Sequence, residues 1–172
     1  MSARAAWRLE SLGFGRVYHY PGGKEDWVEN GLPTEGEEAG QPVVADAVRA
    51  DVATCAPADP LEVARRRAAG GGLEVCVVVN DVRVVLGLLD GRALAGPAAT
   101  AQEAMGEGPT TWRPGRPLAE VVAHLRERDL PRALVTTADG RLVGLLRRQD
   151  AEAELARRGG PAPDDGQGPE PA

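Results

Sequence analysis

Few residues of this sequence belong to the types that most often carry out catalysis or hold metals. Cysteine occurs at Cys55 and Cys76, and histidine at His19 and His124. Two cysteines cannot form a disulfide framework, and the two isolated histidines lack the spacing of metal ligands. Each cysteine lies in an extended or apolar stretch, where a free cysteine acts as a small hydrophobic residue. We therefore expect no catalytic residue and no metal site.

Partners of two kinds are also excluded by the sequence. The formal net charge of the 172 residues is −6, so there is no basic excess to displace the counterions of a nucleic acid. No apolar run reaches the roughly 18 residues that a membrane span needs, and the first ten residues lack the apolar stretch of a secretory signal. Gly22-Gly23-Lys24 lacks the upstream glycine of a phosphate-binding loop. We expect a cytoplasmic protein with neither a nucleic-acid nor a membrane partner.

An internal repeat is the most informative feature of the chain. A shift of 57 residues aligns two segments without a gap, which indicates a duplication. The aligned landmarks are Thr54 with Thr111, Pro57 with Pro114, Pro60-Leu61 with Pro117-Leu118, and Gly87-Leu88-Leu89 with Gly144-Leu145-Leu146.

Each copy has the pattern of a β-α-β-β-α unit. In the second copy, Leu118, Val121, Val122 and Leu125 form one apolar helical face. The first copy has a weaker stripe that starts at Leu61, and its helix ends at the glycines 70–72. β-branched runs that predict hairpins follow at 76–79 with 82–89 and at 133–137 with 141–146, and a short helix closes each unit, most clearly at 149–158.

One unit of this size cannot bury both faces of its sheet, whereas two copies packed together can. We therefore expect an α/β (α+β) fold in which the two copies form a pseudo-symmetric pair.

The repeat resembles a tandem pair of CBS motifs, the regulatory module of the cystathionine-β-synthase type that is also called a Bateman domain. The resemblance covers residues 43–99 as the first motif and 100–158 as the second, and it depends on the Thr-x-x-Pro, Pro-Leu and Gly-Leu-Leu landmarks. It implies a non-catalytic protein that requires no cofactor and binds an adenosine compound, such as AMP, ATP or S-adenosylmethionine, in the cleft between the motifs. It also implies a homodimer.

The family closes each motif with Gly-apolar-x-Thr/Ser-x-x-Asp, in which the acid holds both ribose hydroxyls. A carboxylate suits this role because it offers two acceptor oxygens. The second copy carries the acid as Asp150 but has Arg147 in place of Thr or Ser, and the first copy has Ala93 in place of the acid. The resemblance thus implies at most one intact ribose site, at Asp150.

Other candidate ligand contacts each have a structural alternative. Arg147, Arg148 and Arg132 suit bidentate contact with a phosphate, or belong to the solvated surface. Asp150 holds a ribose or stabilises the start of its helix. Thr111 contacts a ligand or bonds its own turn, and Trp112 stacks on a purine or packs in the core.

Residues 1–35 resemble the C-terminal end of a rhodanese domain. The motifs are Leu12-Gly13-Phe14, Val17-Tyr18, Gly22-Gly23-x-x-x-Trp27 and Gly31-Leu32-Pro33-x-Glu35. The resemblance covers an incomplete α/β segment that lacks the family's catalytic cysteine loop, so we expect no sulfurtransferase activity from it. Residues 36–42 are predicted to be a linker and 159–172 a disordered acidic tail. The alternatives are the back end of a rhodanese–CBS fusion, and a degenerate CBS pair that serves only dimerisation.

Overall fold

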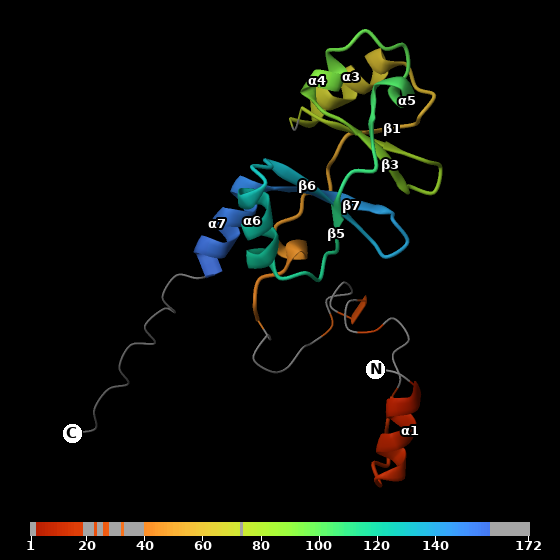
Figure 1. Cartoon of the computed structure of the whole chain (residues 1–172), viewed down its shortest axis with the longest axis vertical. Helices are drawn as coiled ribbons and strands as arrows, with labels where there is room; N and C mark the ends of the chain where they lie inside the picture. The colour runs from red at the N-terminus through yellow and green to blue at the C-terminus, as the bar shows by residue number, and fades with distance from the viewer. Residues whose placement is uncertain are drawn as a thin grey trace, which may run out of the picture.

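The structure is a computed structural model, which describes residues 3–18, 23, 26–27, 32, 40–72 and 74–158. Two small sheets lie next to each other, and the helices of each copy cover the outer face of its own sheet (Figure 1). Figure 1 shows the helix α1 (Ala3–Ser11) apart from both sheets. The layers are therefore helices, sheet, sheet, helices.

The first copy forms a four-stranded sheet in the order β1-β2-β3-β4. β1 pairs in parallel with β2 across the helix α3, and β2 and β3 form the predicted antiparallel hairpin. The elements of the first copy are β1 (Thr54–Cys55), α3 (Leu61–Gly71), β2 (Cys76–Val79), β3 (Val85–Leu89) and α4 (Gly91–Leu94). The start of the second copy contributes α5 (Ala101–Ala104) and the fourth strand, β4 (Gly106–Glu107).

The second copy repeats this order in a three-stranded sheet, β5-β6-β7. Its elements are β5 (Thr111–Trp112), α6 (Leu118–Glu127), β6 (Arg132–Thr136), β7 (Leu142–Arg147) and α7 (Arg148–Arg158). In the first copy a 3-10 helix, η1 (Val44–Asp46), precedes β1.

The strand pairings confirm the duplication. Thr54 pairs with Val77 in the first sheet, and the residues 57 positions later, Thr111 and Leu134, pair in the second. The hairpins have the same register, including an irregularity after Val78 in one copy and after Val135 in the other. The order β-α-β-β-α predicted for both copies is thus present.

Each copy also pairs with a segment that the sequence alone did not assign to it. The Arg49 and Leu145 backbones exchange two N–H···O bonds of 2.9 Å, which places the chain before β1 on the second sheet. The equivalent pairing in the first sheet joins Leu88 with Gly106. Residues leading into each copy therefore pack on the other one.

The two copies meet along a pseudo-twofold axis. Val84 and Arg141, which are equivalent residues, form an isolated bridge with each other. A shared core lies between the sheets, built from Val75, Val77, Val79, Leu134, Leu142 and Leu145. These side chains would be open to water in a single copy, so the two copies depend on each other for burial.

The predicted helix faces are present. Leu118, Val121, Val122 and Leu125 are all buried on α6. On α3 the buried residues are Leu61, Ala64 and Ala68, whereas Val63 is only half-buried. Gly72 ends α3 in the left-handed region at φ 64°, a conformation that glycine adopts without a Cβ penalty.

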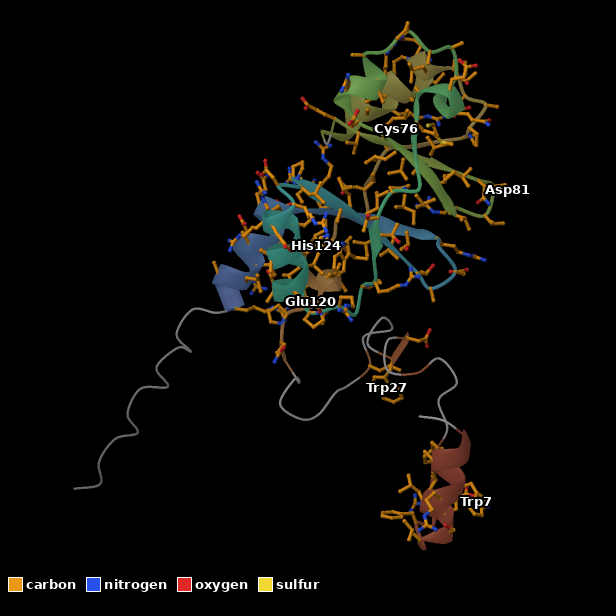
Figure 2. All side chains as sticks on the ribbon, in the orientation of Figure 1. Trp7, Trp27, Cys76, Asp81, Glu120 and His124 are labelled. Carbon is orange, nitrogen blue, oxygen red and sulfur yellow. The ribbon has the colours of Figure 1, made fainter. Side chains whose placement is uncertain are left out.

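Asn80 fixes the turn of the β2–β3 hairpin. Its Oδ1 accepts hydrogen bonds from the backbone N–H groups of Val84 (2.8 Å) and Val82 (3.2 Å), so β3 begins later than the predicted residue 82. We expect Asn80→Ala to lower the free energy of unfolding by about 1 kcal/mol, because both amides lose their acceptor. Chemical denaturation measures this loss. Asp81→Ala, at the exposed tip of the same turn (Figure 2), should change little, and equal effects of the two substitutions would contradict this role.

Part of the N-terminal resemblance lies outside the described residues, as do the tail 159–172 and most of the linker. Gly22, Gly31, Pro33 and Glu35 are among these undescribed positions. In the described part, the α1 residue Trp7 is exposed, as are Phe14 and Tyr18 beyond the helix. Among the described helices, none has the length and apolar character needed to cross a membrane.

Candidate functional site

Three of the predicted ligand residues line one pocket. A cavity of about 330 Å³ is bounded by Arg132, Arg147 and Arg148 of the second copy, together with Gly72 and Glu74 of the first. Pro131, Leu145 and Gln149 complete its lining. The pocket therefore has lining residues from both copies, and three of the eight are arginines.

The local fold explains why these arginines meet. Arg132 begins β6 and Arg147 ends β7, and the two residues are register partners in the antiparallel pair. The Arg148 N–H donates to the Pro131 carbonyl (2.9 Å) where α7 begins, so the third guanidinium starts from the same edge of the sheet. The positive end of the α7 dipole adds to their charge.

Asp150 lies in the first turn of α7 and is paired with Arg147. The guanidinium donates from Nε to Oδ2 (2.6 Å) and from Nη2 to Oδ1 (2.8 Å), and both side chains are about 70% buried, with 30% and 27% exposed. This bidentate bond raises the pKa of Arg147 above its ordinary value. The arginine at the family's Thr/Ser position thus fixes the orientation of the predicted ribose acid.

The bidentate bond does not use all of the acceptor capacity of the Asp150 carboxylate. A carboxylate has about four lone-pair sites, and Arg147 takes one on each oxygen. One site remains on each oxygen. Two adjacent hydroxyl groups are the donors that such a pair of sites can accept.

The other charged contacts around the pocket are exposed. Arg148 pairs with Asp129 at 3.2 Å, but the Asp129 side chain is 96% exposed, so the pair is weak. Asp51 lies at the start of the first copy, and the pKa of its carboxyl is lowered mainly by a hydrogen bond from Arg49 and to a lesser degree by the charge of Arg147. Asp51 therefore lies within electrostatic reach of the pocket.

Thr111 and Trp112 lie elsewhere. Thr111 is exposed on β5 and is not one of the residues that line the pocket. Trp112 is half-buried against the core of the second copy and packs edge-to-face on His124 of α6, with ring centroids 5.3 Å apart. The packing alternative stated for Trp112 is the one that the structure shows.

The first copy has a pocket of different chemistry at the end of its own hairpin, which shares only part of the equivalent lining. This cavity of about 530 Å³ is lined by Asp90 and Ala93, which stand where the second copy has Arg147 and Asp150. The Asp90 Oδ1 accepts a hydrogen bond from the Ala93 N–H (2.8 Å) and so caps α4. The two pockets of the pair are therefore not chemically equivalent.

Sequence reasoning missed Glu74 and Asp90. The 57-residue alignment, which sets Asp90 against Arg147, was a signal that could have identified Asp90. Glu74 gave no comparable signal, because it lies between α3 and β2 and reaches the pocket only through the packing of the two copies. Within the described part of the chain, no cluster of three or more His, Cys, Asp or Glu is placed to hold a metal ion.

Comparisons with known proteins agree with the fold. The family model described as CBS domain matches residues 101–157. No curated protein matches the sequence. Three solved structures with similar folds are 15–21% identical to the chain.

One of them is the structure of CBSX2, a protein from Arabidopsis thaliana, in complex with AMP. It superposes on this chain with a TM-score of 0.61 and 19% sequence identity, and the match covers 67% of this chain and 96% of that one. The CBS domain pair of the protein MJ0100, in complex with 5-methylthioadenosine and S-adenosyl-L-methionine, has a TM-score of 0.61 and 15% identity, covering 69% and 98%. The cytosolic domain of the Mg2+ channel MgtE, in complex with ATP, has a TM-score of 0.57 and 21% identity, covering 63% of this chain and 47% of that one.

These similarities establish the fold as the mixed α+β fold of a tandem CBS domain pair. Neither the family model nor the similar structures support the rhodanese-like interpretation of residues 1–35.

Proposed function

We propose, from the fold of a tandem CBS domain pair, that this protein is a non-catalytic regulatory module that senses an adenosine nucleotide in the pocket between its two copies. The observation that carries the proposal is the meeting of Arg132, Arg147 and Arg148 in one cavity. Asp150 is not one of the lining residues, but it is bonded to Arg147, which is. The similar structures that contain AMP, ATP or S-adenosyl-L-methionine support it.

Each part of the ligand has a matching group. The phosphates would contact the guanidinium groups that line the cavity, since a guanidinium pairs with phosphate oxygens in a bidentate way. The ribose 2′ and 3′ hydroxyls would donate to the open lone pairs of Asp150. AMP, ATP and S-adenosylmethionine remain candidates for the ligand.

The position of the pocket suggests how binding would regulate a partner. Gly72 and Glu74 belong to the first copy and the arginines to the second, so a bound nucleotide would contact both. It would favour whichever arrangement of the two copies brings these groups closest, by its difference in affinity for the two arrangements. We propose that the regulated form is a homodimer.

Calorimetric titration with AMP, ATP and S-adenosylmethionine tests the proposal. We expect at least one of them to bind, and we expect Asp150→Asn to weaken that binding about 10- to 100-fold, because a hydrogen bond to a charged acceptor contributes roughly 1.5–3 kcal/mol. Glu152→Gln is the matched control, since Glu152 lies on the same helix and pairs with Arg126 (2.7 Å). Its affinity should equal that of the wild type.

Two results would contradict the proposal in different ways. Unchanged affinity in Asp150→Asn would remove Asp150 from the site but leave nucleotide sensing intact. Absence of binding by all three compounds to the wild-type protein would reject nucleotide sensing itself.

One observation favours a second candidate function, a CBS pair that serves only dimerisation. Arg147 already forms two hydrogen bonds to the acid that would hold the ribose. Under this alternative, sedimentation analysis would show a stable dimer, and no nucleotide would change its mass or its melting temperature.

A further inference from the structure

The structure brings the two cysteines of the chain together in the core of the first copy. Cys55 lies on β1 and Cys76 on the neighbouring parallel strand β2, where Cys55 is the register partner of Val78. Cys76 is two residues before Val78, so both thiols face the same side of the sheet. That side is covered by α3, and both cysteines are free and buried in one apolar cluster.

The second copy shows that the fold does not need thiols at these positions. The equivalent residues are Trp112 and Ala133, a large side chain next to a small one. Trp112 and Ala133 pack in the core of the second copy without any thiol group. Two contacting thiols in the first copy are therefore a chemical feature of that copy and not a requirement of the packing.

The two thiols differ in acidity because they interact. A hydrogen bond from Cys76 lowers the pKa of Cys55, with a smaller lowering from the charge of Arg67, while burial and the charge of Asp59 oppose it. The same hydrogen bond and burial raise the pKa of Cys76 far above its ordinary value. Cys55 is therefore the more easily ionised of the two thiols, and the thiolate is the nucleophilic form.

We propose that Cys55 and Cys76 are a redox-active thiol pair, converted by a peroxide into an intramolecular disulfide that displaces β1. The Cys55 thiolate attacks one peroxide oxygen, the O–O bond breaks, and Cys55 becomes a sulfenic acid as hydroxide leaves and takes up a proton. The Cys76 sulfur then attacks the Cys55 sulfur, the S–O bond breaks and a second water leaves. The two thiols lose two electrons in total, and one hydrogen peroxide becomes two waters.

The strand register implies that the disulfide must move the backbone. An offset of two residues along strands that lie about 4.8 Å apart places the two Cα atoms roughly 8 Å from each other. A disulfide requires a Cα separation below about 7 Å. β1 is the segment that can move, because it has only two residues and forms the edge of its sheet.

Movement of β1 would reach a neighbouring cavity of about 600 Å³. Asp51, Val52, Ala53 and Thr54, which lead into Cys55, line this cavity together with Arg67 and Gly71. Oxidation would therefore alter this face of the pair. A disulfide that holds a displaced strand is strained, and strained disulfides are the readily reduced, regulatory kind.

Peptide mapping by mass spectrometry tests the proposal. The full-length folded protein is treated with hydrogen peroxide, free thiols are blocked, and the digest is searched for the linked Cys55 and Cys76 peptides. We expect this link to form within one molecule and to disappear after treatment with a dithiol reductant. Amide hydrogen exchange should become faster at residues 51–55 in the oxidised protein.

The control variants are Cys55→Ser and Cys76→Ala, the latter placing in the first copy the residue found at Ala133. Cys76→Ala should stop at a sulfenic acid on Cys55, which a dimedone probe detects, whereas Cys55→Ser should resist peroxide. Three results would overturn the proposal: only intermolecular links, a link that forms in urea but never in the folded protein, or equal peroxide reactivity of the two variants.

Discussion

Replacing Gly144 by alanine should strongly lower the free energy of unfolding of this protein. A Cβ at this position would lie 2.2 Å from the Arg49 carbonyl oxygen and 2.8 Å from its carbon. These are backbone atoms, so the chain before β1 must move away from β7. That movement breaks the two hydrogen bonds that Arg49 exchanges with Leu145. The overpacking and the loss of these hydrogen bonds both destabilise the fold, so we expect the free energy of unfolding to fall by about 3 kcal/mol.

The duplication supplies the controls for this substitution. At Gly87, the equivalent position, a Cβ would first meet the flexible Met105 side chain (2.6 Å) and then the Gly106 carbonyl oxygen (2.9 Å), so Gly87→Ala should have a smaller effect. At Gly91 the space is open, and Gly91→Ala should be close to neutral. Urea denaturation measures all three. A Gly144→Ala protein as stable as Gly91→Ala would show that residues 43–50 do not pack on the second copy.

The second large effect concerns the core between the copies. Leu134 is 2% exposed on β6 and belongs to the shared core with Val77 and Val79 of the first copy. Leu134→Ala should lower the free energy of unfolding by about 2–5 kcal/mol, through lost burial and the cavity left behind. Because this core joins the two sheets, we expect both copies to unfold in one transition, both before and after the substitution.

Leu130→Ala is the control, since Leu130 is 39% exposed and should contribute little. Differential scanning calorimetry distinguishes the outcomes. Two separate transitions, of which Leu134→Ala lowers the melting temperature of only one, would mean that each copy is stable alone. That result would contradict the dependence of the two copies on each other for burial.

The repeat made much of the fold predictable. Two β-branched runs, a proline-initiated helix and a fixed 57-residue offset are local features of the sequence, and the hairpin registers follow from them. The pairing of the segment before β1 with the second sheet was not predictable, because it joins Arg49 with Leu145, which are far apart in the sequence. The Cys55–Cys76 contact was missed for the same reason: it exists only once β1 and β2 lie side by side.

The candidate site was predictable in its residue types but not in its bonding. Placing Arg132 and Arg147 at one end of a hairpin follows from the predicted strands, and the structure has them as register partners. The bidentate bond between Arg147 and Asp150 depends on the rotamers of two side chains one helical turn apart, which spacing does not determine. Thr111 was proposed from a family motif, and its position on β5 sets it apart from the arginine pocket.

The most direct test of nucleotide sensing locates the ligand on the chain. Amide chemical shifts of isotopically labelled protein should be recorded by NMR while ATP is added. We predict that the shifted amides cluster at the arginine pocket, around residues 72–74, 132 and 145–150. Shifts confined to the pocket of the first copy, around residues 88–93, or no shifts at saturating ATP, AMP and S-adenosylmethionine, would contradict the assignment of the site to the end of the second copy.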